Sequence, residues 1–158
     1  MSERINREEF SDLVRRLKEL AWSWRAEDLD ALAADFGWQV DGRGERTATL
    51  TTPMGFSTGD VDFSAEGAVT HFSVAVCGYA DDTPEGLREL QDIFTDDAEA
   101  ATAVLGEPTS RIPGEDAEIR WKGAETTIRL MRDTALVTLG LARNDYLAEH
   151  DWAVSQGL

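Results

Sequence analysis

Hydrophobic residues recur every three to four positions in several regions, the spacing of an amphipathic helix. The longest such region predicts a central helix from Thr83 to Leu105, with Thr83 as its N-cap and Gly106 as its stop. Because the apolar stripe keeps its phase across the aspartate pair at 96–97, we expect one continuous helix. The residues predicted to face the core are Leu87, Leu90, Phe94, Ala98, Ala101 and Leu105.

Two more helices are predicted near the N-terminus. The first runs from Asn6 to Leu20, where Asn6 is the N-cap and Glu9 completes the spacing of a capping box. The second runs from Arg25 to Phe36 and ends at Gly37, which tolerates a left-handed backbone.

A short last helix is predicted from Tyr146 to Ser155. Either Asn144 or Asp145 is expected to cap it, because both residue types accept hydrogen bonds at helix N-termini. Its expected apolar contacts are Leu147 and Trp152.

Between the helices, the hydrophobic period shortens to two, which is typical of strands. Turns at 41–44, 66–67, 123–124 and 132–133 favour antiparallel pairing, and 53–59 is expected to be a loop. The prediction is therefore one α+β domain spanning 1–158, with helices on a single antiparallel sheet of six to seven strands, in the order ααββββαβββα. The strands are expected at 38–40, 47–52, 60–64, 69–77, 118–122, 126–131 and 135–141.

The charge balance narrows the range of partners. The 158 residues carry 31 acidic and 15 basic side chains, a formal net charge of −16. Such a charge repels nucleic acid and anionic membranes but attracts a basic protein. We expect no nucleic-acid or membrane partner. The charged N-terminus does not resemble a signal segment, and no apolar run is long enough to span a membrane, so a cytoplasmic location is expected.

The residues usually found in active sites are sparse. Cys77 is the single cysteine, so the chain forms no internal disulfide and no multi-cysteine zinc site. Cys77 and His71 share a face of the same predicted strand, but six residues of strand separate them by about 20 Å, too far for a catalytic pair. Cys77 is therefore interpreted as a small, partly buried residue.

Carboxylate pairs offer little more. Asp60 and Asp62 share a strand face, and Asp81 and Asp82 begin a loop, but neither pair lies in a glycine-containing calcium loop. The sequence also lacks the common nucleotide-binding, zinc-protease and serine-hydrolase motifs. We expect no catalytic residue, no metal site and no cofactor, and therefore not an enzyme.

One charged surface is nevertheless well defined. From 81 to 99 the chain has eight acids and a single base, Arg88. The simpler explanation of these acids is a solvated helix face. The more specific explanation is a surface that binds a cationic protein. The candidate protein-binding residues lie opposite the predicted apolar stripe of the central helix: Glu85, Glu89, Asp92, Asp96 and Glu99.

The tryptophans also allow two interpretations. Trp22, Trp24, Trp38 and Trp121 lie near helix ends or in strands, where core packing is the usual role. The alternative is that one of them is an exposed anchor for a binding partner.

Two segments resemble a known group of proteins. One is an acidic helix closed by Gly-Trp before a strand, at 24–40, and the other spans 101–141, with LGEP at 105–108 followed by Trp121 and two strands. Together they resemble a family of small, acidic, uncharacterised actinobacterial proteins that look like immunity partners of secreted polymorphic toxins. The layout is also similar to type III secretion chaperone-like domains. The resemblance implies protein binding and transfers no catalytic residue.

These observations lead to an expected function. The leading hypothesis is a non-enzymatic immunity protein that neutralises a basic secreted toxin, such as a nuclease, by occluding its site. The alternative is a chaperone or adaptor for a secreted effector, which would use the open sheet face or an apolar groove. A third class, a small-molecule-binding or hydrolytic domain, would require a closed pocket with converging polar groups.

Overall fold

The computed structural model describes residues 3–54 and 58–158, and its fold is α+β. The elements are α1 (Arg7–Glu19), a 3-10 turn (Ala26–Asp28), α2 (Leu29–Asp35), β1 (Gln39–Arg43), β2 (Thr47–Thr51), β3 (Gly59–Phe63), β4 (Val69–Ala75), α3 (Pro84–Leu105), β5 (Ser110–Ile112), β6 (Ala117–Lys122), β7 (Thr126–Arg132), β8 (Val137–Arg143) and α4 (Asn144–Ser155). The predicted fold class is confirmed, with eight strands in the described residues instead of six to seven. The additional strand is β5, in a stretch for which no strand was predicted.

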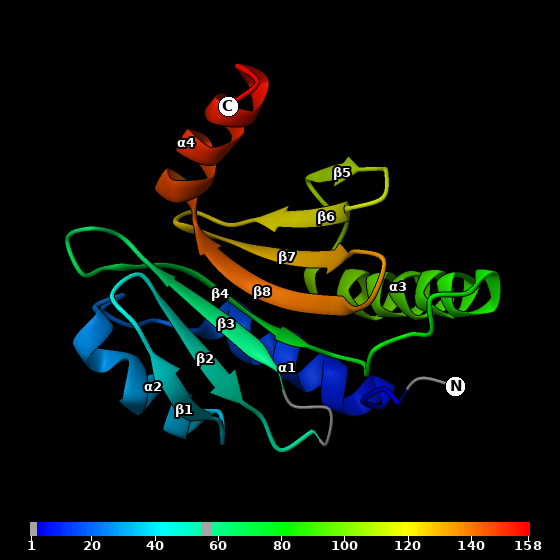
Figure 1. Cartoon of the computed structure of the whole chain (residues 1–158), viewed down its shortest axis with the longest axis horizontal. Helices are drawn as coiled ribbons and strands as arrows, with labels where there is room; N and C mark the ends of the chain where they lie inside the picture. The colour runs from blue at the N-terminus through cyan, green and yellow to red at the C-terminus, as the bar shows by residue number, and fades with distance from the viewer. Residues whose placement is uncertain (1–2, 55–57) are drawn as a thin grey trace.

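The sheet consists of two four-stranded antiparallel meanders joined at its centre. Its order is β1-β2-β3-β4-β8-β7-β6-β5, so the last strand of each meander pairs with the last strand of the other (Figure 1). α3 connects the end of β4, at the centre, to β5 at the far edge. The C-terminal strand therefore lies in the interior of the sheet.

Strand register separates the side chains into an apolar face and a polar face. One transverse row on the apolar face is Val61, Phe72, Leu141, Ile128 and Trp121, all buried. The neighbouring row on the opposite face is Asp60, Ser73, Gly140, Arg129 and Arg120. Polar side chains thus cover the face that α1 does not.

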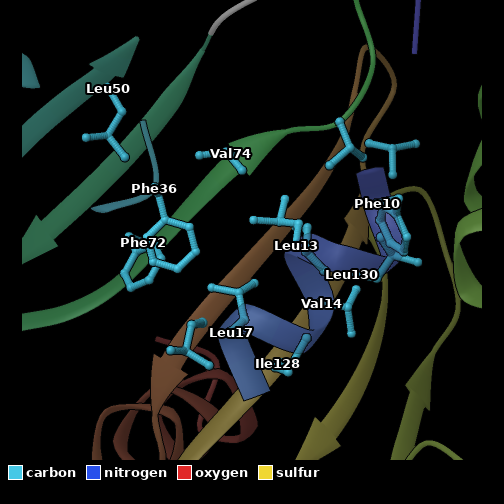
Figure 2. Packing of buried hydrophobic residues seen from close by; sticks show 14 of the residues in the cluster. Phe10, Leu13, Val14, Leu17, Phe36, Leu50, Phe72, Val74, Ile128 and Leu130 are labelled. Carbon is cyan, nitrogen blue, oxygen red and sulfur yellow. The ribbon is translucent and has the colours of Figure 1, made fainter. Parts of the chain in front are cut away.

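The helices α1 and α3 pack against each other and against the apolar face (Figure 1). Figure 2 shows the apolar side chains of α1, such as Phe10 and Leu17, lying among Phe72, Val74 and Leu130 of the sheet. Each fully buried side chain of this size stabilises the fold by roughly 1.5–3 kcal/mol. The predicted cap is confirmed, because Asn6 accepts a hydrogen bond from the Glu9 backbone N–H at 2.8 Å.

α3 is one continuous helix, as predicted. The Thr83 side chain accepts a hydrogen bond from the Gly86 N–H at 3.0 Å, and Gly106 ends the helix with φ 88°. The buried face is, however, rotated by about 60° from the predicted stripe, taking 100° per residue. It contains Ile93, Asp97 and Ala100, whereas Leu87 is 44% exposed. The rotation arises because α3 contacts two neighbours, α1 and the sheet, rather than the sheet alone.

Two boundaries near β1 differ from the prediction. The second helix begins as a 3-10 turn, so its α-helical part is only Leu29–Asp35, although Gly37 ends the segment as expected with φ 77°. The predicted turn at 41–44 belongs largely to β1, where a β-bulge between Val40 and Gly42 absorbs the irregular sequence. The predicted loop at 53–59 lies partly outside the described residues.

The last helix also departs from the prediction. α4 begins at Asn144, whose side chain bonds Thr127 and Gly123 instead of capping the helix. Leu147 is buried as expected, but Trp152 is 62% exposed because the end of the helix projects away from the sheet (Figure 1).

Candidate functional site

The five predicted protein-binding acids of α3 differ in their exposure to solvent. Glu85, Asp92, Asp96 and Glu99 are exposed, and Glu89 is half-buried. The rotation of the helix explains the difference, because it turns Glu89 toward the core and leaves Asp92 and Glu99 pointing most directly outward. The helix therefore brings the predicted acids together on one face, but not equally.

Two of these acids contact arginines of the same chain. Glu85 lies 3.5 Å from Arg88 one turn away, and both side chains are largely exposed, so this pair contributes little stability. Asp96 Oδ2 accepts a hydrogen bond from Arg4 Nη1 at 3.1 Å. The acidic face is thus partly neutralised at its Asp96 end.

Arg4 also binds a carboxylate that the sequence interpretation did not assign. Its Nη2 donates to Asp97 Oδ1 at 3.0 Å, and Asp97 is only 2% exposed. Burial raises the pKa of the Asp97 carboxyl to about 7, although Arg4 acts in the opposite direction. The available signal was the helical phase, because Asp97 lies two turns after the buried Leu90.

The residues before α1 hold Arg4 in place. Ile5 N–H donates to the Val76 carbonyl at 3.2 Å, and Gly78 N–H donates to the Glu3 carbonyl at 2.7 Å. This short pairing continues beyond the end of β4 and directs the Arg4 side chain toward α3. A cavity of about 370 Å³ adjoins it, lined by Arg4, Ile5, Asn6, Arg7, Asp96, Asp97 and Ala100.

The polar face of the sheet carries a second charged cluster. Arg129 donates to the two oxygens of Glu118 at 3.0 and 2.9 Å, and Arg120 also contacts Glu118. Arg120 then reaches α4, where it donates to both oxygens of Asp151 at 2.7 and 3.0 Å. The hydrogen bonds to Arg129 and Arg120 lower the pKa of Glu118 against the effect of burial. This alternation of charges is what nearly buried ions require.

His71 lies on the same face, under α4. Its Nε2 is 2.7 Å from Asp62 Oδ2, and its ring stacks on Tyr146, which in turn stacks on His150. Burial is the largest influence on His71 and lowers its pKa, while Asp62 raises it. Both ring nitrogens have partners, since Nδ1 is 3.1 Å from the Thr70 hydroxyl. His71 is therefore a structural contact of α4 and not a free base.

The other candidate groups do not form a reactive site. Cys77 is fully buried, burial raises the pKa of its thiol, and its Sγ accepts a hydrogen bond from Val137 N–H at 3.4 Å. In the described part of the chain, no group of three or more His, Cys, Asp or Glu side chains could hold a metal ion.

The tryptophans divide between core and boundary. Trp38 and Trp121 are buried, and Trp121 Nε1 donates to the Gly106 carbonyl at 3.0 Å, which joins β6 to the end of α3. Trp22 and Trp24 are half-buried and pack together on Phe72, with ring centroids 5.1 Å apart. Trp152, which was not a predicted anchor, is the tryptophan most exposed to solvent.

Across residues 3–54 and 58–158, none of the helices has the length and apolar character needed to cross a membrane.

Comparison with known proteins identifies a family and a fold. The model of a family of unknown function, DUF6301, matches residues 8–143. No curated protein matches the sequence. The solved structure of a DUF4309 family protein, YjgB from Bacillus subtilis, is similar in fold, with a TM-score of 0.53 and 11% sequence identity. The similarity covers 87% of this chain and 97% of that one.

Proposed function

This chain belongs to the DUF6301 family of unknown function, and we propose that it is a non-enzymatic protein that binds a cationic protein partner through α3. The observation that carries the proposal is the line of outward acids on this helix. Glu85, Asp92 and Glu99 recur every seven residues, about 10.5 Å apart along the axis, on a continuous helix of 22 residues. A rigid helix fixed to the sheet presents these charges at constant spacing.

Electrostatics favours a basic partner over other classes. The net charge of −16 attracts a cationic protein over a distance and raises the association rate, and contacts at α3 then fix the orientation. We propose more specifically an immunity role, in which α3 occupies the positively charged site of a secreted toxin such as a nuclease. The family resemblance described from the sequence supports this reading.

The chaperone or adaptor alternative is supported less well. An extended apolar client on the polar face of the sheet would cover Arg129 and Glu118, which need their charged partners in place. The half of that face next to α4 is also already occupied by Tyr146 and Leu147.

Binding to the product of an adjacent, toxin-like reading frame tests the proposal. Changing Glu85, Asp92 and Glu99 together to lysine should weaken the complex at least tenfold and reduce its dependence on salt. The matched control changes Glu45, Glu66 and Glu149 to lysine, which are exposed acids on other elements and give the same net charge. Equal weakening by both triple variants would show that net charge, rather than α3, governs binding.

A further inference from the structure

We infer that Asp96 and Asp97, with the cavity beside them, form a binding site for a guanidinium group, which Arg4 fills in the free protein. An arginine of the cationic partner can take over this site by displacing Arg4. The second statement rests on the proposed function, whereas the first concerns the chain alone.

The two carboxylates have the geometry of a binding site for one planar cation. Two nitrogens of the same guanidinium bind carboxylates of two consecutive residues, at 3.1 Å for Asp96 and 3.0 Å for Asp97. Asp97 lies at the buried end and Asp96 at the exposed end, so the site opens outward from the core. The adjoining cavity of about 370 Å³ leaves room beside the bound side chain.

Guanidinium fits this arrangement better than ammonium. Its nitrogens form a rigid fork that reaches two acceptors at once, and it loses less hydration on burial than a lysine ammonium. Asp97 requires a neighbouring cation, because an ionised carboxylate that is 2% exposed is unstable without one. Asp96 connects the buried Asp97 to the protein surface, because it belongs to the acidic face of α3.

The present occupant is a partly exposed side chain of a short segment that lies outside the helices and strands. Arg4 lies before α1, and two backbone hydrogen bonds attach its segment to the residues that follow β4. Its side chain is 33% exposed, unlike the carboxylate it neutralises. Replacement of Arg4 by an incoming arginine would leave Asp97 neutralised throughout, so exchange conserves the charge pair that burial demands. The N-terminal segment therefore acts as an internal competitor for the partner.

Chemical rescue of an Arg4→Ala variant tests the site without any partner. Removal of Arg4 should lower the melting temperature at pH 8.5 by about 5–10 °C, because it leaves a buried carboxylate unpaired. Millimolar methylguanidinium should restore part of that loss in a saturable way and shift the backbone amide resonances around Ala100. Methylammonium chloride at the same concentration is the control, since it supplies charge and ionic strength without the fork.

Further variants test whether methylguanidinium acts at Asp97. Rescue should disappear in Arg4→Ala combined with Asp97→Asn, and it should weaken at pH 5.5, where Asp97 is protonated. If Arg4→Ala does not fold, Arg4→Lys replaces it, and methylguanidinium should then compete with the lysine. Equal stabilisation by methylammonium, or no saturable effect of methylguanidinium, would overturn the guanidinium site.

Failure of this inference is separable from failure of the proposed function. The rescue experiment uses the isolated protein, whereas the proposed function depends on Glu85, Asp92 and Glu99, which do not touch Arg4. If the partner uses the site, Arg4→Ala should bind it more tightly than the wild type. Unchanged or weaker binding of the partner, together with successful rescue, would reject the exchange and leave a purely structural guanidinium site.

Discussion

The imidazole of His71 and the phenol ring of Tyr146 lie nearly parallel, with centroids 4.5 Å apart and planes inclined by 23°. This stack connects β4 to α4, two elements separated by about half the chain. His71 is also bound to Asp62 of β3, so α4 rests on a residue that the sheet already fixes.

Acidification should weaken this contact. The pKa of His71 is lowered in the folded state, mainly by burial, so below neutral pH the unfolded chain binds more protons than the folded one. The contribution to stability is present at high pH and is lost as pH falls from about 6.5 through the folded pKa. Urea unfolding at pH 7.5 and 5.5 should show a larger loss for the wild type than for His71→Gln. His150→Gln should reduce this difference only slightly, because burial, not the charge of His150, is the largest cause of the lowered His71 pKa.

Asp151 should control how firmly α4 is attached. Asp151→Asn removes the charge that Arg120 binds through two hydrogen bonds. Because the Asp151 side chain is half exposed, we expect a loss of only ~1 kcal/mol, equivalent to about fivefold faster amide exchange in α4. Glu149→Gln, on the exposed side of the same helix, should leave exchange unchanged. Unaltered exchange in Asp151→Asn would show that apolar contacts alone hold the helix.

Asp97 should reduce stability at alkaline pH. Its pKa rises from 3.8 to about 7 on folding, so the folded state binds more protons than the unfolded state between these values. Stability is therefore lost as pH rises through this range, by on the order of 4 kcal/mol for a shift of this size. Asp97→Asn should be increasingly more stable than the wild type from pH 4 to pH 8, as measured by chemical denaturation. A constant difference would contradict the raised pKa.

Two leucines of α3 should differ sharply in how much their substitution by alanine destabilises the fold. Leu90 is fully buried, so Leu90→Ala should cost about 2–5 kcal/mol. Leu87→Ala should change stability by less than about 0.5 kcal/mol, because this side chain is 44% exposed. Thermal unfolding of the two variants distinguishes the observed face of α3 from the one predicted from its sequence, which would give large losses for both.

Local signals predicted the fold well. The caps at Asn6 and Thr83 and the stop at Gly37 depend on a few neighbouring residues, so the sequence specifies them directly. β5 was missed because its three residues are all exposed and lack the alternation that marks a half-buried strand. Its backbone pairing with β6 alone makes it a strand.

The candidate site was predictable only in part. The acidic face of α3 follows from helical periodicity, but the rotation of the helix, which turns Glu89 toward the core, does not. The pairing of Arg4 with Asp97 joins residues 93 positions apart, and no local pattern encodes such a contact. The polar cluster of Arg129, Glu118 and Arg120 was missed for the same reason, since it forms only after neighbouring strands are in register.

The interior position of β8 has a consequence for biosynthesis. During translation β1 to β4 leave the ribosome first, but the open edge of β4 stays unpaired until β8 has been synthesised. β8 must then close two edges at once, those of β4 and β7. Nascent chains that stop before residue 137 would expose the unpaired edges of β4 and β7, and unpaired strand edges are templates for aggregation. Release of a soluble product should therefore depend on completing the last strand during or soon after translation.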